Sequence, residues 1–234
     1  MRVYSYPPLV EGILIQRYQR FFADVRLSCG EIVVAHCPNT GPMTGVCLPG
    51  SRVWLSISDN PKRKLPYTWE IIEIDGELIG INTALPNRVI GQMIAEHLIP
   101  ELEFYHTYKS EVPYGNEKSR IDFLLLGNDT DRYVEIKNTT WSKGSLALFP
   151  DTITTRGQKH LRELTNIIDS KHKSTIIYFI NRGDCSRFAP GDEADPSYGK
   201  LLRDALEKGL EILACRFRQS PQGIDYLGLG EICL

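Results

Sequence analysis

Short segments rich in β-branched and aromatic residues, many alternating apolar with polar positions, fill the first eighty residues. They predict strands at residues 10–17, 21–28, 31–36, 52–58, 67–75 and 77–82. Turn formers such as Cys29-Gly30, Pro49-Gly50 and Asp75-Gly76 separate them. Because no helical pattern interrupts this run, we expect a small closed barrel of about five strands. An OB-like barrel is the economical prediction, and an SH3-like barrel is the alternative.

The pattern changes after Asn82, where apolar residues begin to recur at helical spacing. The new spacing predicts a helix over residues 88–98 with Asn87 as its N-cap. The elements that follow are strands at 103–112, 119–126 and 132–138, a helix at 155–170, a strand at 175–181, a helix at 197–208 and a strand at 211–216. We therefore predict an α+β chain of two domains, with a barrel at residues 1–82 and an α/β domain at residues 83–234.

Composition and charge restrict the class of protein. Of the 234 residues, 42% are apolar and 24% are charged, which excludes a disordered chain. No apolar run approaches the ~18 residues of a membrane span. Lys and Arg number 27 against 29 Asp and Glu, a net charge of −2, so any nucleic-acid surface must be a local patch.

Six cysteines are present, but no Cys-x-x-Cys occurs and the N-terminal residues lack a secretory apolar core. Reduced thiols in the cytoplasm are the expectation. His36, Cys37 and Cys47 do not have the spacing of a zinc site.

One group of residues carries candidate chemistry: Asp122, and Glu135 with Lys137 two positions later. Side chains alternate across a strand, so Glu135 and Lys137 share a face. A hairpin turn at residues 129–130 would place Asp122 opposite Lys137, on that same face. A register slip of two residues would keep the three together. A solvated strand face is the competing interpretation, but the apolar neighbours on both strands favour a site, because buried charges need partners.

Two carboxylates and a lysine on adjacent strands suit a site that binds a divalent metal and a phosphodiester. Mg²⁺ or Mn²⁺ would take carboxylate oxygens from Asp122 and Glu135, with the Ile136 carbonyl as a further ligand. Lys137 would orient water or stabilise charge on the phosphate. Asp122, Glu135 and Lys137 form the Asp…Glu-x-Lys pattern of the restriction-endonuclease-like, or PD-(D/E)xK, fold. The helix before the sheet offers Glu96 as a third metal ligand, with Gln92, Glu111 and Glu117 as other candidates.

Basic and aromatic residues supply candidate contacts to nucleic acid. Arg156, Lys159 and His160 open a predicted helix, whose free N–H groups favour a phosphate. In the barrel, the candidates are Arg17, Arg20, Phe21, His36, Asn39, Lys62, Arg63 and Lys64. Core packing for Phe21 and solvated loops for the basic residues are the competing interpretations.

The chain resembles the sugar fermentation stimulation protein A family in ordered phrases along nearly its whole length. They include His36-Cys37-Pro38-Asn39-Thr40-Gly41, Lys109-Ser110-Glu111-Val112, Ser119-Arg120-Ile121-Asp122-Phe123, Tyr133-Val134-Glu135-Ile136-Lys137 and Thr155-Arg156-Gly157-Gln158-Lys159-His160. The resemblance implies an OB-like N-terminal domain and a restriction-endonuclease-like C-terminal domain. It also implies non-specific DNA binding in the regulation of sugar (maltose) metabolism, and Lys109 and Arg120 join the candidate DNA contacts.

Three functions remain open at this point. The chain is a DNA-binding protein with an active metal-dependent nuclease site, a DNA-binding regulator that uses the nuclease fold as a platform, or an oligosaccharide binder that uses the barrel. We expect DNA as the partner, no membrane association and a cytoplasmic location, and we leave homodimer formation open.

Overall fold

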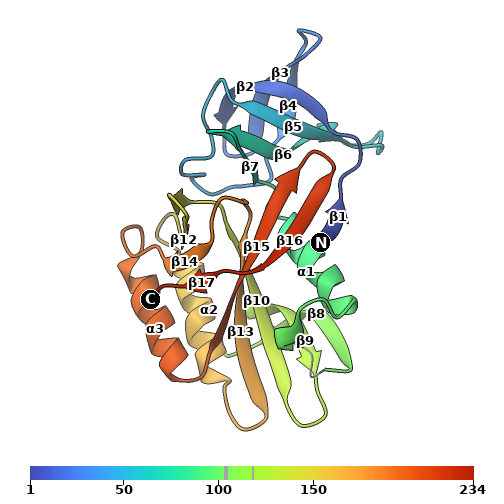
Figure 1. Ribbon diagram of the computed structural model, residues 1–234. Helices are drawn as coiled ribbons and strands as arrows, with labels where there is room; N and C mark the ends of the chain where they lie inside the picture. The colour runs from blue at the N-terminus through green and yellow to red at the C-terminus, as the bar shows by residue number, and fades with distance from the viewer. Residues whose placement is uncertain (103–104, 118) are drawn as a thin grey trace.

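The computed structural model describes residues 1–102, 105–117 and 119–234. A β-barrel stands at one end of a second, larger unit built on a twisted sheet (Figure 1). The two-domain α+β architecture predicted from the sequence is confirmed.

The barrel is a closed sheet of five strands with a sixth strand attached. Its strands are β2 (Val10–Tyr18), β3 (Phe22–Leu27), β4 (Ile32–His36), β5 (Arg52–Ile57), β6 (Tyr67–Ile74) and β7 (Glu77–Gly80). They follow the order β4-β3-β2-β5-β6-β7, and pairing of β4 with β6 closes the barrel. Alternate side chains such as Leu14, Val25 and Trp69 point into the closed core. This is the OB-like barrel that the sequence predicts.

The second unit contains a seven-stranded sheet in the order β1-β16-β15-β13-β10-β9-β8. These strands are β1 (Arg2–Ser5), β8 (Thr107–Tyr114), β9 (Ser119–Leu126), β10 (Asp131–Thr139), β13 (His172–Ile180), β15 (Glu211–Ser220) and β16 (Gly223–Leu229). A small second sheet contains β11 (Ser142–Lys143), β12 (Leu146–Phe149), β14 (Arg187–Pro190) and β17 (Glu231–Ile232).

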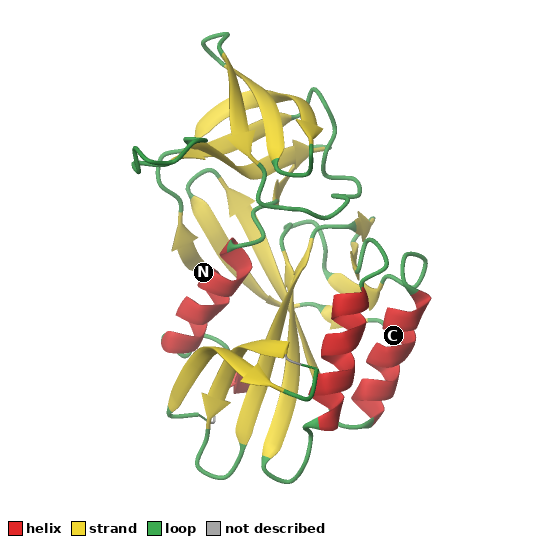
Figure 2. Ribbon diagram, turned by 180° about the vertical axis from the view of Figure 1, so that it is seen from behind, coloured by secondary structure: helices red, strands yellow, loops and turns green. Residues whose placement is uncertain are grey.

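Helices cover both faces of the large sheet (Figure 2). They are α1 (Leu85–Ala95), α2 (Thr155–Asn166) and α3 (Pro196–Glu207), with a 3₁₀ turn at Pro100–Leu102. Phe123, Val134 and Phe179 pack on the α1 side, whereas Leu124 and Tyr178 pack on the side of α2 and α3. The central strands are therefore buried on both faces, which explains their nearly continuous apolar sequence.

The ends of several elements differ from prediction. Helix α1 begins at Leu85 rather than residue 88, because Pro86 suits a first turn and the Asn82 side chain accepts the N–H of Ala84 at 3.0 Å. Asn87, the predicted N-cap, thus lies inside the helix. Part of the strand predicted at 103–112 falls on residues 103–104, outside the described residues, and β8 begins at Thr107.

The N-terminal strand β1 belongs to the second sheet, where it pairs with β16. The predicted barrel limits of 1–82 include this strand, so the structure differs from the sequence-based division there. The side chain of Arg2 bonds Asp225 at 2.6 Å across the same pair. The chain therefore begins in the large sheet and enters the barrel only at β2.

Hydrogen bonds join the barrel to the end of the large sheet where the parallel strands β10 and β13 finish. Gly80 N donates to Asn181 O at 3.0 Å, and Gly183 N donates to Glu77 Oε1 at 2.7 Å. In a sheet of this kind, ligands bind beside the carboxyl ends of the strands. The barrel thus stands over the edge where a site is expected.

The remaining expectations concern membranes and thiols. No helix in the described part of the chain is long and apolar enough to cross a membrane. All six cysteines are free thiols.

Candidate active site

Asp122 on β9 lies beside Glu135 and Lys137 on β10. The two strands pair from Leu125 to Phe123, with Leu124 opposite Tyr133. This register is shifted by two residues from the predicted one. A shift of two preserves the face of every side chain, so the three groups still meet.

The backbone pairing of β9 with β10 stops at Val134, and beyond it the Asp122 side chain accepts a backbone N–H of β10 in place of a backbone carbonyl. Its Oδ2 accepts the N–H of Ile136 at 2.7 Å, and its Oδ1 accepts Asn87 Nδ2, also at 2.7 Å. Burial and, secondly, the nearby Glu135 carboxylate raise the pKa of Asp122 to about 6, against the lowering effect of the two hydrogen bonds and of Lys137. Asp122 is therefore held rigidly, one strand away from Glu135.

Glu135 is 3% exposed and is held from one side only. Its Oε1 accepts Lys137 Nζ at 2.6 Å and also contacts His160 Nδ1. Burial alone would raise the pKa of this carboxyl, but Lys137 and His160 outweigh burial and lower it. Its Oε2 is buried and has no partner among the described residues. An unpartnered buried carboxylate oxygen is costly unless something else binds there.

Helix α2 presents its first two turns to this group. Thr154 caps the helix by accepting the N–H of Gly157 at 3.1 Å. His160 is buried behind Glu135, so it positions that carboxylate instead of facing solvent. Lys159 donates to the carbonyl of Glu117, and only Arg156 of the three predicted phosphate contacts is exposed.

Two groups near the site were missed by sequence reasoning. The hydroxyl of Tyr114 is buried without a partner among the described residues, and burial together with Glu135 and Glu163 raises its pKa. Glu163 on α2 accepts the N–H of Glu117 through Oε1 at 2.6 Å, while its buried Oε2 has no partner within the described residues. The residues around Glu163 are mostly polar or charged, as on a protein surface, so the sequence does not predict that Glu163 is buried.

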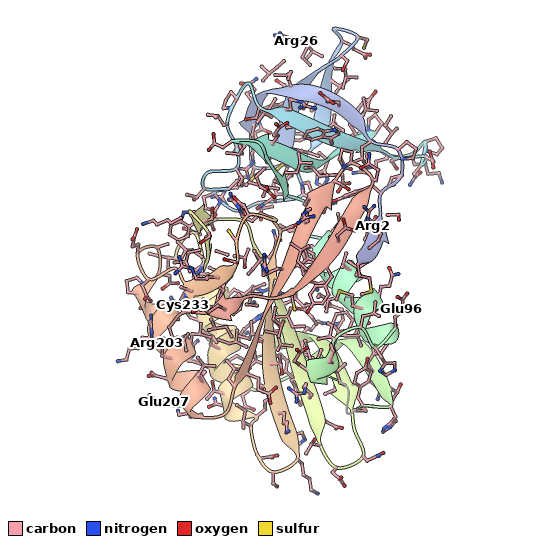
Figure 3. The ribbon with its side chains drawn as sticks, in the orientation of Figure 1. Arg2, Arg26, Glu96, Arg203, Glu207 and Cys233 are labelled. Atoms are coloured by element: carbon pink, nitrogen blue, oxygen red, sulfur yellow. The ribbon has the colours of Figure 1, made fainter. Side chains whose placement is uncertain are left out.

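The structure does not bring Glu96 to this group. Glu96 is the exposed C-cap of α1, where it accepts Gln92 Nε2 at 3.0 Å, and it lies at the periphery of the molecule (Figure 3). The residue of α1 that reaches Asp122 is Asn87, nine residues earlier, or ~13 Å along the helix axis. An amide therefore occupies the position at which an acid was predicted.

Two of the predicted DNA contacts have structural roles in the barrel. Arg17 donates through Nη2 to the carbonyl oxygens of Arg20, Asn39 and Gly41, at 3.2, 2.8 and 3.0 Å. Asn39 is buried, and its Oδ1 accepts the N–H of Gly41 at 3.0 Å. By contrast, Arg20 lies exposed in the β2–β3 turn and Phe21 is 48% exposed.

The other predicted contacts are spread over several surfaces. His36 and Arg63 line a cavity of about 340 Å³ between the two units, together with Tyr4 and Arg88. The remaining predicted contacts are exposed, namely Lys62, Lys64, Lys109 and Arg120. Lys109 lies on the edge strand β8 and Arg120 on its neighbour β9, away from the barrel, so the predicted set does not form one patch.

The residues present fit a small divalent cation. Among the described residues, no group of three or more His, Cys, Asp or Glu side chains is arranged to hold a metal. Mg²⁺, however, is usually held by one or two carboxylates and keeps several waters. Asp122 and Glu135, whose Oε2 has no partner among the described residues, provide two such carboxylates.

Comparison with known proteins gives consistent matches along the chain. Residues 84–223 match the model of the "Sugar fermentation stimulation protein RE domain", and residues 15–81 match the "SfsA N-terminal OB domain". A sugar fermentation stimulation protein homolog of Cyanothece sp. is 58% identical, covering 99% of this chain and 98% of the relative. Its counterpart in Trichormus variabilis is 60% identical, with the same coverage of both chains.

A solved structure, that of SfsA from Pyrococcus furiosus in complex with Ca²⁺, has the same architecture. It is 29% identical in sequence, superimposes with a TM-score of 0.91, and each chain covers 100% of the other. With both domain models matched in order and relatives aligned from end to end, this chain belongs to the sugar fermentation stimulation protein (SfsA) family.

Proposed function

We propose that this chain is a DNA-binding protein whose second domain carries a divalent-metal-dependent nuclease site. The observation that carries the proposal is the arrangement of Glu135. One oxygen of this buried carboxylate is held by Lys137 and His160, while the other has no partner among the described residues. A purely structural ion pair would not leave that oxygen bare. The Asp122 carboxyl is close enough for Glu135 to raise its pKa.

The chain's own residues have separable roles in this proposal. Asp122 and Glu135 would hold Mg²⁺ or Mn²⁺, and the Ile136 carbonyl would complete the protein ligands. A bound metal supplies Lewis acidity and an activated water. The Lys137 side chain is 12% exposed, against 5% for His160, so Lys137 would place a positive charge beside the phosphate. His160 positions Glu135 and is not a DNA contact.

The solved SfsA relative supports a divalent cation as the metal. Its structure is a complex with Ca²⁺, which prefers oxygen ligands as Mg²⁺ and Mn²⁺ do. We expect the same carboxylates to bind each of these ions here, with Mg²⁺ or Mn²⁺ supporting cleavage.

The exposed side chains of the barrel favour nucleic acid over an oligosaccharide as the ligand. Phe21 and Arg20 are exposed together at the β2–β3 turn, and Lys62 and Lys64 are exposed on the loop before β6. Cations interleaved with an exposed aromatic ring suit a phosphate backbone and stacked bases. We propose DNA binding of this kind, without sequence readout, for a protein linked to the regulation of sugar (maltose) metabolism.

A cleavage assay tests the nuclease site. Labelled single- and double-stranded oligonucleotides are incubated with Mn²⁺, Mg²⁺ or EDTA, and Lys137→Ala is purified in parallel. We expect metal-dependent cleavage that falls at least ~100-fold in the variant, as when a charge-stabilising group is removed from other enzymes. Lys143→Ala, at an exposed ion pair with Glu193, is the control and should cleave normally.

Metal binding is measured separately by isothermal titration with Ca²⁺. Glu135→Ala should abolish binding, and unchanged binding would remove Glu135 from the metal site. DNA binding without cleavage by the wild-type protein would reduce the second domain to a binding platform.

A further inference from the structure

A cavity of about 400 Å³ lies where the barrel meets the second unit, at the carboxyl end of β10. The barrel contributes the loop around Asn39 and Gly41 to one wall. The second unit contributes Asn138, Thr140, Trp141 and Arg156 to the other walls. The cavity therefore exists only where the two units meet, and its size suits one small ligand.

Helix α2 links this cavity to the candidate active site, because Arg156 lines the cavity and His160 contacts Glu135. Arg156 precedes His160 by four residues on α2, which places it on the same face and ~6 Å further along the helix axis. A molecule bound through its phosphate at Lys137 would therefore extend into the cavity.

The walls combine buried polar groups with one aromatic side chain. Asn39 and Thr140 are each only 8% exposed. The Oδ1 of Asn39 accepts the N–H of Gly41, and the Oδ1 of Asn138 accepts Asn181 Nδ2 at 3.0 Å. In the parts of the chain that the structure describes, neither amide nitrogen donates a hydrogen bond. Trp141 is half-buried and lines the cavity, so it brings an aromatic ring to the cavity wall.

The charged groups of the cavity are also suited to a nucleotide. Arg156 is exposed, and its guanidinium has no hydrogen-bond partner among the residues that the structure describes, so it can take a phosphate bidentately. The one acidic group, Asp151, is engaged with the barrel, where its Oδ2 accepts the N–H of Thr44 at 3.3 Å. Donors to a base edge, an aromatic face and a guanidinium thus surround one cavity.

We propose that this cavity binds one unpaired nucleotide of the DNA strand that occupies the Asp122–Glu135–Lys137 site. The proposal rests on the proposed function and adds the form of its substrate. A base within a duplex reaches such a pocket only by leaving the stack, which costs a few kcal/mol. The protein therefore binds single strands, strand ends or unpaired bases in preference to intact duplex.

Tryptophan fluorescence tests the proposal directly, because Trp54 and Trp69 are buried in the barrel and Trp141 alone is half-buried. A twelve-residue oligo(dT) is titrated into the full-length protein in EDTA, and a blunt DNA hairpin is titrated in parallel. We expect saturable quenching by oligo(dT), and affinity at least tenfold weaker for the hairpin.

Variants identify the cavity residues. Binding is measured by the anisotropy of labelled oligo(dT), which does not depend on tryptophan. Trp141→Ala and Arg156→Ala should each weaken binding fivefold or more, in line with the loss of one stacked base or one phosphate contact. Trp141→Phe should retain most of the affinity, and Lys200→Ala, an exposed cation on α3, should retain all of it.

Unchanged oligo(dT) affinity in folded Trp141→Ala and Arg156→Ala would overturn the proposal, as would hairpin binding equal to that of oligo(dT). Circular dichroism and melting temperature establish that each variant is folded. Oligo(dT) binding is measured in EDTA and therefore does not depend on the metal. Loss of metal-dependent cleavage with intact oligo(dT) binding in the wild type would remove the proposed nuclease activity and leave the nucleotide site in place.

Discussion

Glu70 shows how burial of a single carboxyl couples the stability of this protein to pH. The side chain is 6% exposed, and it accepts hydrogen bonds from Ser56 Oγ at 2.6 Å and Asn82 Nδ2 at 2.7 Å. Burial raises its pKa, and these two donors with Arg88 and Arg63 only partly oppose the shift. A raised pKa means that the folded state binds this proton more tightly than the unfolded state. The contribution to stability is therefore full at low pH and is lost as pH rises through the folded pKa.

We expect Glu70→Gln to gain stability relative to the wild type as pH rises. The amide is neutral, and Ser56 Oγ, which can donate or accept, would still find a partner. Urea unfolding from pH 4 to 8 measures the difference in free energy of unfolding between the two proteins. Glu73→Gln, nearer the surface on the same strand, is the control. A Glu70→Gln difference that stays constant with pH would contradict the assignment.

The candidate site residues were more predictable from the sequence than the residues that support them. Alternation alone placed Glu135 and Lys137 on one face, and a two-residue error in register did not move Asp122 away from them. The supports come from elsewhere in the chain, as with Asn87 on α1 and His160 on α2. The alternation of a strand does not show which residue of a neighbouring helix will contact it. For this reason Glu96 is the helix residue predicted at the site, whereas Asn87 is the one that contacts Asp122.

Among the elements, the β2–β3 hairpin depends on Arg17. Its guanidinium joins the hairpin turn at Arg20 to the loop at Asn39 and Gly41 through three carbonyl oxygens. We expect Arg17→Ala to lower the free energy of unfolding by about 1.5–3 kcal/mol, the range for hydrogen bonds made by a charged group. Urea unfolding checks this value. Arg26→Ala, at the exposed end of β3 (Figure 3), should change stability by less than ~0.5 kcal/mol.

Elements with local signals were predictable, and elements with distant partners were not. Strand β9 was predicted with its observed bounds because its apolar run is flanked by turn residues. Strand β1 pairs with β16, more than two hundred residues later, so no local pattern indicates it. The short strands β11 and β17 make only two-residue pairings in the small sheet, too few to leave a period in the sequence.

For the whole molecule, the arrangement of the two units depends on close backbone contact at Gly80. Its N–H donates to Asn181 O, and a methyl group at position 80 would lie 2.2 Å from Asn181 Oδ1. Asn181 in turn bonds Asn138, which lines the interdomain cavity, and Gln219 on β15. A side chain at Gly80 would therefore separate the barrel from the sheet and disturb the cavity wall.

We expect Gly80→Ala to lower the melting temperature and weaken oligo(dT) binding together, because one contact holds the two units and shapes the cavity. Asn181→Ala will also be destabilising, since it removes two buried hydrogen-bond partners. In the double variant the smaller side chain leaves room for the methyl group. Its loss of unfolding free energy should therefore be smaller than the sum of the two single losses by ~1 kcal/mol or more. Strict additivity in urea unfolding would show that Gly80 and Asn181 do not meet, and that the barrel is held over the cavity by other contacts.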